Sequence, residues 1–284
     1  MYLTLERKLG ENVRNIIDAR YELQGVNVLL KNWAYPMQLS SGVFTLGPDG
    51  GKLQDAIMVG LRGGEASISG NMYWKQFPSK KKLLPEIKFT GTNFPVDDIV
   101  IQSLGDRGEK ILSSLGLNAT IDAAGMVLAN DLGKPYPTLQ IRVRDGRVRP
   151  NDGRFEIDNL NGYIAVHDKD VQITQIKGKH QQADFTLKGE LPKNKPVNLI
   201  FSGQGIPLTQ KVLDLIPPSA DKRDDARRII DPLQLTGQFD MQLRLFNEKP
   251  SAPWKSQLRL FPRELDAVVR NQPVKLTQMQ GWVD

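Results

Sequence analysis

Few side chains of this sequence stand in arrangements that perform catalysis. The chain contains two histidines, His167 and His180, and no cysteine. His167 begins the segment His-Asp-Lys-Asp over residues 167–170, and a histidine beside an aspartate occurs in catalytic triads and in metal sites. The segment joins two runs of alternating apolar residues, however, and its own residues favour turns. The sequence therefore predicts a polar hairpin turn at this position.

Other catalytic and metal-binding patterns are missing from the sequence. His180 lies in the polar segment Lys179–Gln182, which predicts a loop. With no cysteine and two isolated histidines, a transition metal would find few ligands, so we expect neither a metal nor a cofactor. There is no Gly-x-Ser-x-Gly turn and no Gly-x-x-x-x-Gly-Lys loop. Because acid–base chemistry would require the fold to gather scattered carboxylates, we expect a protein that is not an enzyme.

The excess of positive charge allows two interpretations. A formal net charge of +6 fits an ordinary soluble surface, and it also fits contact with an anionic surface such as lipid headgroups. One basic cluster is Lys80–Lys82, and a second consists of arginines that alternate with aliphatic residues over residues 141–149. We interpret the second as a hairpin with Asp145–Gly146 at its turn. Because no aromatic residues alternate with these arginines, we expect no nucleic-acid partner.

Alternation of apolar and polar residues predicts the strands that position these side chains. The clearest run extends from Leu233 to Leu245, with polar residues at the intervening positions. Turn-forming residues separate shorter runs at 47–51, at 151–153 and at Asn161–Gly162. Aromatic residues make up 7% of the chain, so the core should be mainly aliphatic. The fold class that we predict is mainly β, with antiparallel strands.

The sequence repeats itself at an interval of 112 residues. Phe89–Val96 reads F-T-G-T-N-F-P-V, and Phe201–Leu208 reads F-S-G-Q-G-I-P-L. In each copy we expect the proline, Pro95 or Pro207, to be the first residue of a short helix, where its missing N–H costs nothing. Apolar residues at helical spacing follow each proline, and alternating runs resume afterwards. Helical inserts are therefore predicted near residues 95–115 and 207–230.

Partial copies at both ends extend the repeat over the whole chain. Arg14–Asp18 resembles Arg227–Asp231. We predict the end of a preceding unit at 1–30, repeat units at 31–138 and 139–250, and the start of a further unit at 251–284. No apolar run approaches the length of a membrane span, and no apolar signal region follows Met1. Both a cytoplasmic protein and an internal piece of a longer exported chain fit this, and the incomplete repeats favour the second.

The repeat-bearing segments resemble a known family. The series begins with a predicted strand, Val197–Gly203, and an apolar–proline–apolar step, Ile206–Leu208. A Pro-Pro pair, Pro217–Pro218, and a second predicted strand that ends in aspartate, Leu235–Asp240, follow. This series is similar to that of the large AsmA-like proteins of bacterial envelopes. The resemblance implies an elongated, repetitive antiparallel sheet curled into a taco-like groove, with short helices inserted once per repeat. It also implies lipid binding and transport between the inner and outer membranes, a role in outer-membrane assembly, and a location in the periplasm, with an inner-membrane anchor outside this segment.

An apolar sheet face must either be covered or bind something along its length. The resemblance favours an open groove that holds the acyl chains of phospholipid or another lipid. A purely structural or adhesin-like scaffold, with its faces packed shut and no ligand, stays the alternative. The candidate groove-lining residues are the alternating apolar ones: Ile141, Val143, Ile157, Phe185, Leu187, Leu235, Phe239, Met241 and Leu243.

Overall fold

The computed structural model describes most of the chain, and the regular elements in the described part are strands. It describes residues 2–6, 16–30, 33–78, 81–98, 116–149, 156–208, 236–250, 252–269, 272–276 and 281–283. No helix of a full turn is defined within these ranges. The strands are β1 (Tyr2–Glu6), β2 (Ile16–Glu22), β3 (Val26–Leu30), β4 (Trp33–Gly47), β5 (Gly50–Gly60), β6 (Glu65–Gln76), β7 (Lys81–Val96), β8 (Leu117–Ala129), β9 (Pro135–Val148), β10 (Ile157–His167), β11 (Asp170–His180), β12 (Ala183–Leu191), β13 (Asn198–Pro207), β14 (Thr236–Phe246), β15 (Lys255–Val269), β16 (Gln272–Leu276) and β17 (Gly281–Val283).

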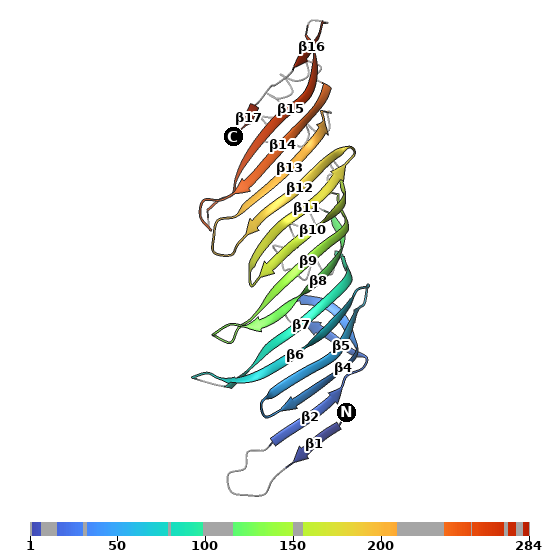
Figure 1. Ribbon diagram of the computed structural model, residues 1–284, viewed down its shortest axis with the longest axis vertical. Helices are drawn as coiled ribbons and strands as arrows, with labels where there is room; N and C mark the ends of the chain where they lie inside the picture. The colour runs from blue at the N-terminus through green and yellow to red at the C-terminus, as the bar shows by residue number, and fades with distance from the viewer. Residues whose placement is uncertain are drawn as a thin grey trace. The chain divides into compact units, whose positions relative to one another are not determined.

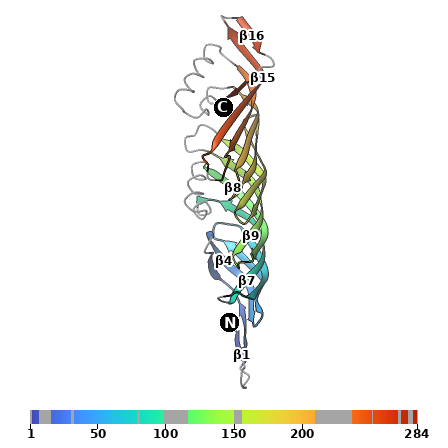
Figure 2. The same ribbon diagram turned by 90° about the vertical axis from the view of Figure 1, so that its left-hand side faces the viewer.

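Strands that follow one another in the chain pair antiparallel, so the protein is mainly β and forms a single open antiparallel sheet (Figure 1). Two strands bend and change partners along their length. The first half of β4 pairs with β3 and its second half with β2, and β15 pairs in the same way with β17 and then β16. Figure 2 shows the same strands from the side.

Contacts divide the chain into two compact units. Unit 1 comprises Met1–Ser113, Asn118–Arg142 and Ala165–Lys169, and unit 2 comprises Ser114–Leu117, Val143–Ile164 and Asp170–Asp284. Strands β4 to β8 lie largely in unit 1, and strands β11 to β17 lie in unit 2. The predicted repeat units at 31–138 and 139–250 stay a prediction.

Each unit has an apolar and a polar sheet face because side chains alternate along every strand. In unit 2, Leu187 of β12 lies opposite Phe201 of β13, which in turn lies opposite Leu243 of β14. In unit 1, Ala56 of β5 lies opposite Ile68 of β6 on the corresponding apolar face. The predicted alternation in β12 and β14 is confirmed by these registers.

The two copies of the sequence repeat form the same irregularity in the sheet. Asn93 in β7 has a φ of 59°, and Gly205 in β13 has a φ of 64°. At each residue the register shifts against the next strand, which is the signature of a β-bulge with a left-handed residue. Asparagine and glycine are the residues that adopt this conformation most readily. The two copies of the motif, 112 residues apart, therefore form the same kind of bulge.

The proline lies in a strand in both copies, and is not the first residue of a helix as expected. Pro95 pairs with Thr120 of β8, and Pro207 pairs with Gln238 of β14. A proline is compatible with a sheet beside a bulge because the ladder of hydrogen bonds is already interrupted there. The rest of the predicted inserts, near 95–115 and 207–230, lies almost wholly outside the described residues.

Two predicted turns are wrong. Asp145–Gly146 lies inside β9 and Asn161–Gly162 lies inside β10. Asp145 has a φ of 50°, so it takes the left-handed conformation of a hairpin turn, but it does so within one strand. The predicted turns at 47–51 and after His167 are confirmed, and the turn at 151–153 lies outside the described residues.

Glycines in β6 and β12 allow the backbone of the neighbouring strand to approach closely. A Cβ atom added at Gly70 of β6 would lie 2.3 Å from the carbonyl oxygen of Glu86. A Cβ atom at Gly189 of β12 would lie 2.1 Å from that of Asn198. Such glycine kinks, together with bulges, are what bend a flat sheet. The sequence of each unit thus encodes curvature as well as strands.

Candidate functional site

The predicted groove-lining residues fall into two groups by exposure. Val143, Ile157, Phe185 and Phe239 are buried, with exposed fractions of 8%, 8%, 3% and 7%. Ile141, Leu187, Met241 and Leu243 are only half-buried. Leu235 lies outside the described residues. The predicted lining is therefore partly core and partly accessible surface.

Three of the four buried residues lie in the apolar core of unit 2. Ile157, Phe185 and Phe239 belong to one apolar cluster, which also contains Leu160, Ala183 and Ile206. The ring of Phe185 stacks on that of Phe201, with 5.3 Å between their centroids. Side chains packed in this way have no free surface to offer a ligand, and they stabilise the sheet instead.

The half-buried group continues the apolar face toward the opposite ends of the same strands. Leu187, Phe201, Leu243 and Leu258 lie opposite one another across β12 to β15. A second row runs through Leu199 and Leu245, and all six side chains are half-buried. We call these two rows the apolar rows, defined by Leu187, Phe201, Leu243, Leu258, Leu199 and Leu245.

Sequence reasoning omitted four of the six residues of the apolar rows from the candidate lining. Phe201, Leu199, Leu245 and Leu258 all stand at alternating apolar positions of their strands. The signal that could have found them is the register between strands, because it decides which alternating residues become neighbours. The rows are a continuous apolar strip, and such a strip can contact an acyl chain through dispersion and the hydrophobic effect alone.

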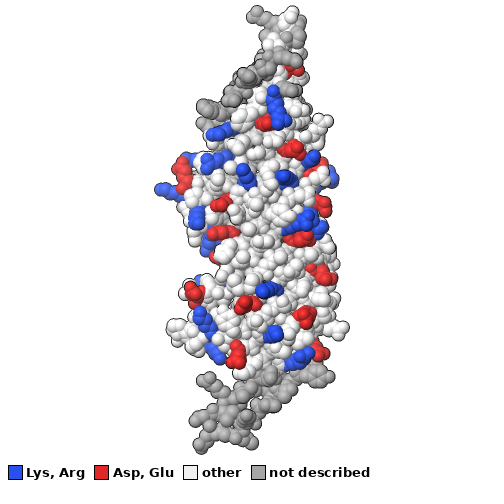
Figure 3. All heavy atoms as spheres, in the orientation of Figure 1, with Lys and Arg blue, Asp and Glu red and all other residues white. Residues whose placement is uncertain are grey.

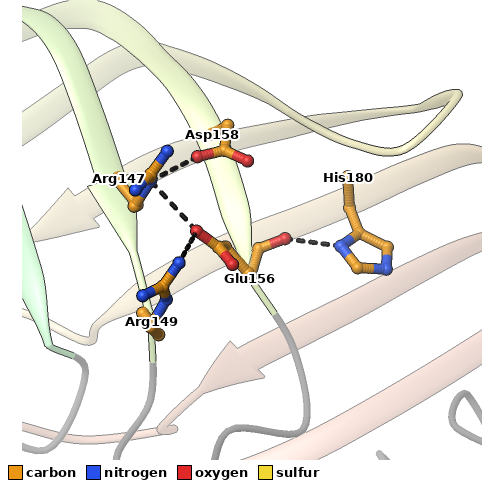
Figure 4. A network of polar contacts seen from close by, with 5 residues as sticks. All are labelled: Arg147, Arg149, Glu156, Asp158 and His180. Carbon is orange, nitrogen blue, oxygen red and sulfur yellow. Dashed lines mark hydrogen bonds and ion pairs between the residues drawn. The ribbon is translucent and has the colours of Figure 1, made fainter.

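The polar face of unit 2 carries a network of paired charges (Figure 4). The Nε atom of Arg147 lies 2.5 Å from Asp158 and 3.0 Å from Glu156, and Arg149 lies 2.7 Å from Glu156. The hydrogen bond and charge of Asp158, with the charge of Glu156, raise the pKa of Arg147. The positive charges of the two arginines balance the negative charges of the two carboxylates, so the network joins the ends of β9 and β10 electrostatically.

The two histidines serve local structure. Nδ1 of His167 lies 3.1 Å from Oγ1 of Thr138, and its ring meets that of Tyr136 edge-on at 5.6 Å. Nδ1 of His180 lies 2.5 Å from the carbonyl oxygen of Glu156 (Figure 4). Across the described ranges, no three His, Cys, Asp or Glu residues come close enough to hold a metal ion.

A shallow depression of about 320 Å³ lies on the polar face of unit 1. Lys52 and Asp55 of β5, Ser69 of β6, and Glu86 and Lys88 of β7 line it. Asp55 is a left-handed residue with a φ of 48° at a register shift between β5 and β6. Two lysines balance two acids there, so the depression has no strong preference for ligands of either charge.

Comparison of the chain with family models, with curated proteins and with solved structures finds no match. In the part of the chain that the structure describes, no helix has the length and apolar character required to cross a membrane. Inference about function therefore rests on the geometry of the sheet and on the sequence pattern.

Proposed function

We propose that the chain binds acyl lipid along the apolar face of its sheet, as a segment of an AsmA-like protein of the bacterial envelope. In this proposal the sheet curls into a groove. The full protein is anchored in the inner membrane, extends into the periplasm, and passes phospholipid or another acyl lipid toward the outer membrane, where it supports membrane assembly. The chain contributes no catalysis.

The observation that carries the proposal is the pair of apolar rows in unit 2. Six large apolar side chains on four adjacent strands are aligned by register and half-buried. Burying apolar surface is worth about 25 cal/mol per Å², or about 0.8 kcal/mol for each buried CH₂ group. An acyl chain laid across the rows would therefore gain several small, equivalent contributions. Binding of this kind is not tied to one position, so a lipid can slide along the strip.

The opposite face supports the same proposal because it would remain in water. Arg147, Asp158 and Glu156 pair on that face, and the arginines of β9 alternate with its apolar residues. A sheet with one apolar and one charged face can shield lipid on one side and remain soluble on the other.

The test compares one charge placed in the rows with the same charge placed on the polar face. Leu243→Arg puts a cation between Phe201 and Leu258. Gln172→Arg is the matched control, because Gln172 is exposed and lies opposite Glu190. We expect phospholipid to co-purify with the parent and the control, and to be largely lost from Leu243→Arg, as measured by mass spectrometry of extracted lipid. Parent protein that carries no lipid, or equal lipid in both variants, would contradict the proposal.

A structural scaffold without ligand is the second candidate. The observation in its favour is the burial of Ile157, Phe185 and Phe239, which are packed in the core. If the scaffold is correct, Leu243→Arg lowers stability but no variant differs in bound lipid. Urea unfolding measured beside lipid content separates the two candidates.

A further inference from the structure

The ends of two hairpins in unit 1 bring lysines and aromatic rings together. Nζ of Lys81 lies 5.4 Å from the ring centroid of Trp74. Nζ of Lys82 lies 4.8 Å from the ring centroid of Phe77, and that of Lys75 lies 5.7 Å from it. We call these residues and the neighbouring Leu132 the lysine–aromatic cluster: Trp74, Lys75, Phe77, Lys81, Lys82 and Leu132.

The cluster is a fixed arrangement across two hairpins. Lys82 donates a hydrogen bond from Nζ to the carbonyl oxygen of Leu132 at 3.3 Å, which ties the β6–β7 hairpin to the β8–β9 hairpin. The backbone of Gly133 lies against the ring of Phe77, since an added Cβ atom there would be 2.7 Å from the ring. Phe77 thus packs between the hairpins, and the lysines around it are held at the surface.

The exposed side chains of the cluster are of two kinds. Trp74 is 38% exposed and Leu132 is 67% exposed, although both are large and apolar. Within the described part of the chain, Lys75, Lys81 and Lys82 form no ion pair with a carboxylate, unlike Lys179 and Lys255. Figure 3 shows basic and uncharged surface where the β6–β7 hairpin projects, with acidic surface nearby. Among the described residues, the hairpin ends therefore present lysines that are not paired with a carboxylate around apolar tips.

We propose that the lysine–aromatic cluster docks the hairpin ends of unit 1 onto an anionic phospholipid bilayer. Lysines near such a surface are attracted to its headgroups. Tryptophan prefers the boundary between headgroups and acyl chains, because its ring is apolar and its N–H is polar. Leu132 at the tip of the second hairpin inserts beside it.

A nucleic acid is the competing partner, because aromatic rings among cations also stack with bases. The exposure of Leu132 favours the bilayer over a nucleic acid. An aliphatic side chain that is 67% exposed has no base or phosphate to recognise, whereas it gains free energy on entering a bilayer. This docking surface is separate from the apolar rows, and it acts whether or not those rows bind lipid.

The test measures binding of the full chain to vesicles of phosphatidylcholine with about 30% phosphatidylglycerol, and to vesicles of phosphatidylcholine alone, by flotation. The triple variant K75Q/K81Q/K82Q removes the cations of the cluster. The matched control, K52Q/K88Q/K177Q, removes three other exposed lysines. Each lysine near an anionic surface contributes roughly a factor of five to partitioning, so we expect a loss on the order of 100-fold in the first variant and a much smaller loss in the control.

Leu132→Gln tests the apolar contact, and it should weaken vesicle binding several-fold without changing the dependence on salt. Fluorescence anisotropy of a labelled single-stranded oligonucleotide serves as the second arm. Tight binding of the oligonucleotide with no flotation would overturn the proposal in favour of a nucleic-acid partner. Equal flotation of both triple variants would overturn it as well. Lipid that co-purifies in the apolar rows is measured separately from vesicle binding. Each proposal can therefore fail without affecting the test of the other.

Discussion

The bulge at Gly205 allows a specific prediction about which contact stabilises the sheet. Its amide donates a hydrogen bond to Oδ1 of Asp240 on the next strand at 2.8 Å. Nε of Arg263 on β15 lies 3.1 Å from the same carboxylate, whose side chain is 26% exposed. A bulge leaves a backbone N–H outside the ladder, and Asp240 supplies the acceptor that the neighbouring backbone no longer provides. We predict that Asp240→Ala unfolds at lower urea concentration than the parent.

The magnitude follows from the two contacts. A hydrogen bond to a charged, partly buried group contributes about 1.5–3 kcal/mol, and an ion pair with an exposed arginine adds about 0.5 kcal/mol. Asp240→Ala should therefore lower the free energy of unfolding by about 2–3 kcal/mol. Asp240→Asn should lower it by less than about 1 kcal/mol, because the amide oxygen still accepts from the backbone. Asn161 already acts in this way for the amide of Asp145, at 3.4 Å.

Urea unfolding gives the free energies, and amide hydrogen exchange at Gly205 locates the effect. Loss of the acceptor should speed exchange at that amide more than elsewhere in β13. Arg263→Gln is the control, because it removes the ion pair and leaves the hydrogen bond. The reasoning is refuted if Asp240→Ala and Asp240→Asn are equally stable, or if exchange at Gly205 is the same in both.

Three further outcomes follow from contacts in unit 1 and unit 2. Gly189→Ala should lower the free energy of unfolding by about 1–3 kcal/mol, because its Cβ atom would meet a carbonyl oxygen at 2.1 Å, while Gly47→Ala, with nothing within 4 Å, should be neutral in the same urea assay. Phe185→Ala should cost about 3–5 kcal/mol, since this ring is 3% exposed in the core. The hydrogen bond and charge of Lys255 lower the pKa of Glu248; this pair therefore stabilises the fold above the ordinary pKa of a glutamate and ceases to do so as pH falls through the lowered value. Lys255→Gln should return the pKa of Glu248 toward that ordinary value, which an NMR titration of its carboxyl carbon detects.

Alternation along the chain was sufficient to predict strands such as β12 and β14. Leu187, Met241 and Leu243 lie on the apolar face as their spacing requires, because a period of two has only one outcome in a pleated strand. Composition likewise predicted a core that is mainly aliphatic, and it contains Ile157, Leu160 and Ile206.

Turns and bulges were confused because they use the same residues. Asp145–Gly146 has the composition of a hairpin turn, but the aspartate supplies a left-handed residue within a strand. Proline's preference for the first helical position led to a predicted helix start at Pro95, which is instead a strand residue two positions after Asn93. A single left-handed residue can reverse a chain or merely bend it, and the decision depends on hydrogen bonds to the neighbouring strand.

Exposure along the apolar face was beyond sequence reasoning for a different reason. Phe239 and Leu243 occupy equivalent alternating positions of β14, but Phe239 is 7% exposed and Leu243 is half-buried. The difference arises because Phe239 belongs to the buried cluster of unit 2, whereas Leu243 is not part of it. The lysine–aromatic cluster was missed similarly, because hairpin register brings Lys81 to Trp74 from seven residues away.

The bulges also clarify what the repeated motif encodes. The motif supplies a left-handed asparagine or glycine, then an apolar residue and proline, and an aspartate follows on the next strand. In both copies that aspartate, Asp122 or Asp240, accepts the amide of the left-handed residue, at 3.0 Å and 2.8 Å. The left-handed residue of the motif and the aspartate on the next strand therefore serve the backbone geometry of the bulge. Residues such as Leu187, Leu245 and Leu258 stand outside the motif, and the proposed lipid binding depends on these half-buried side chains.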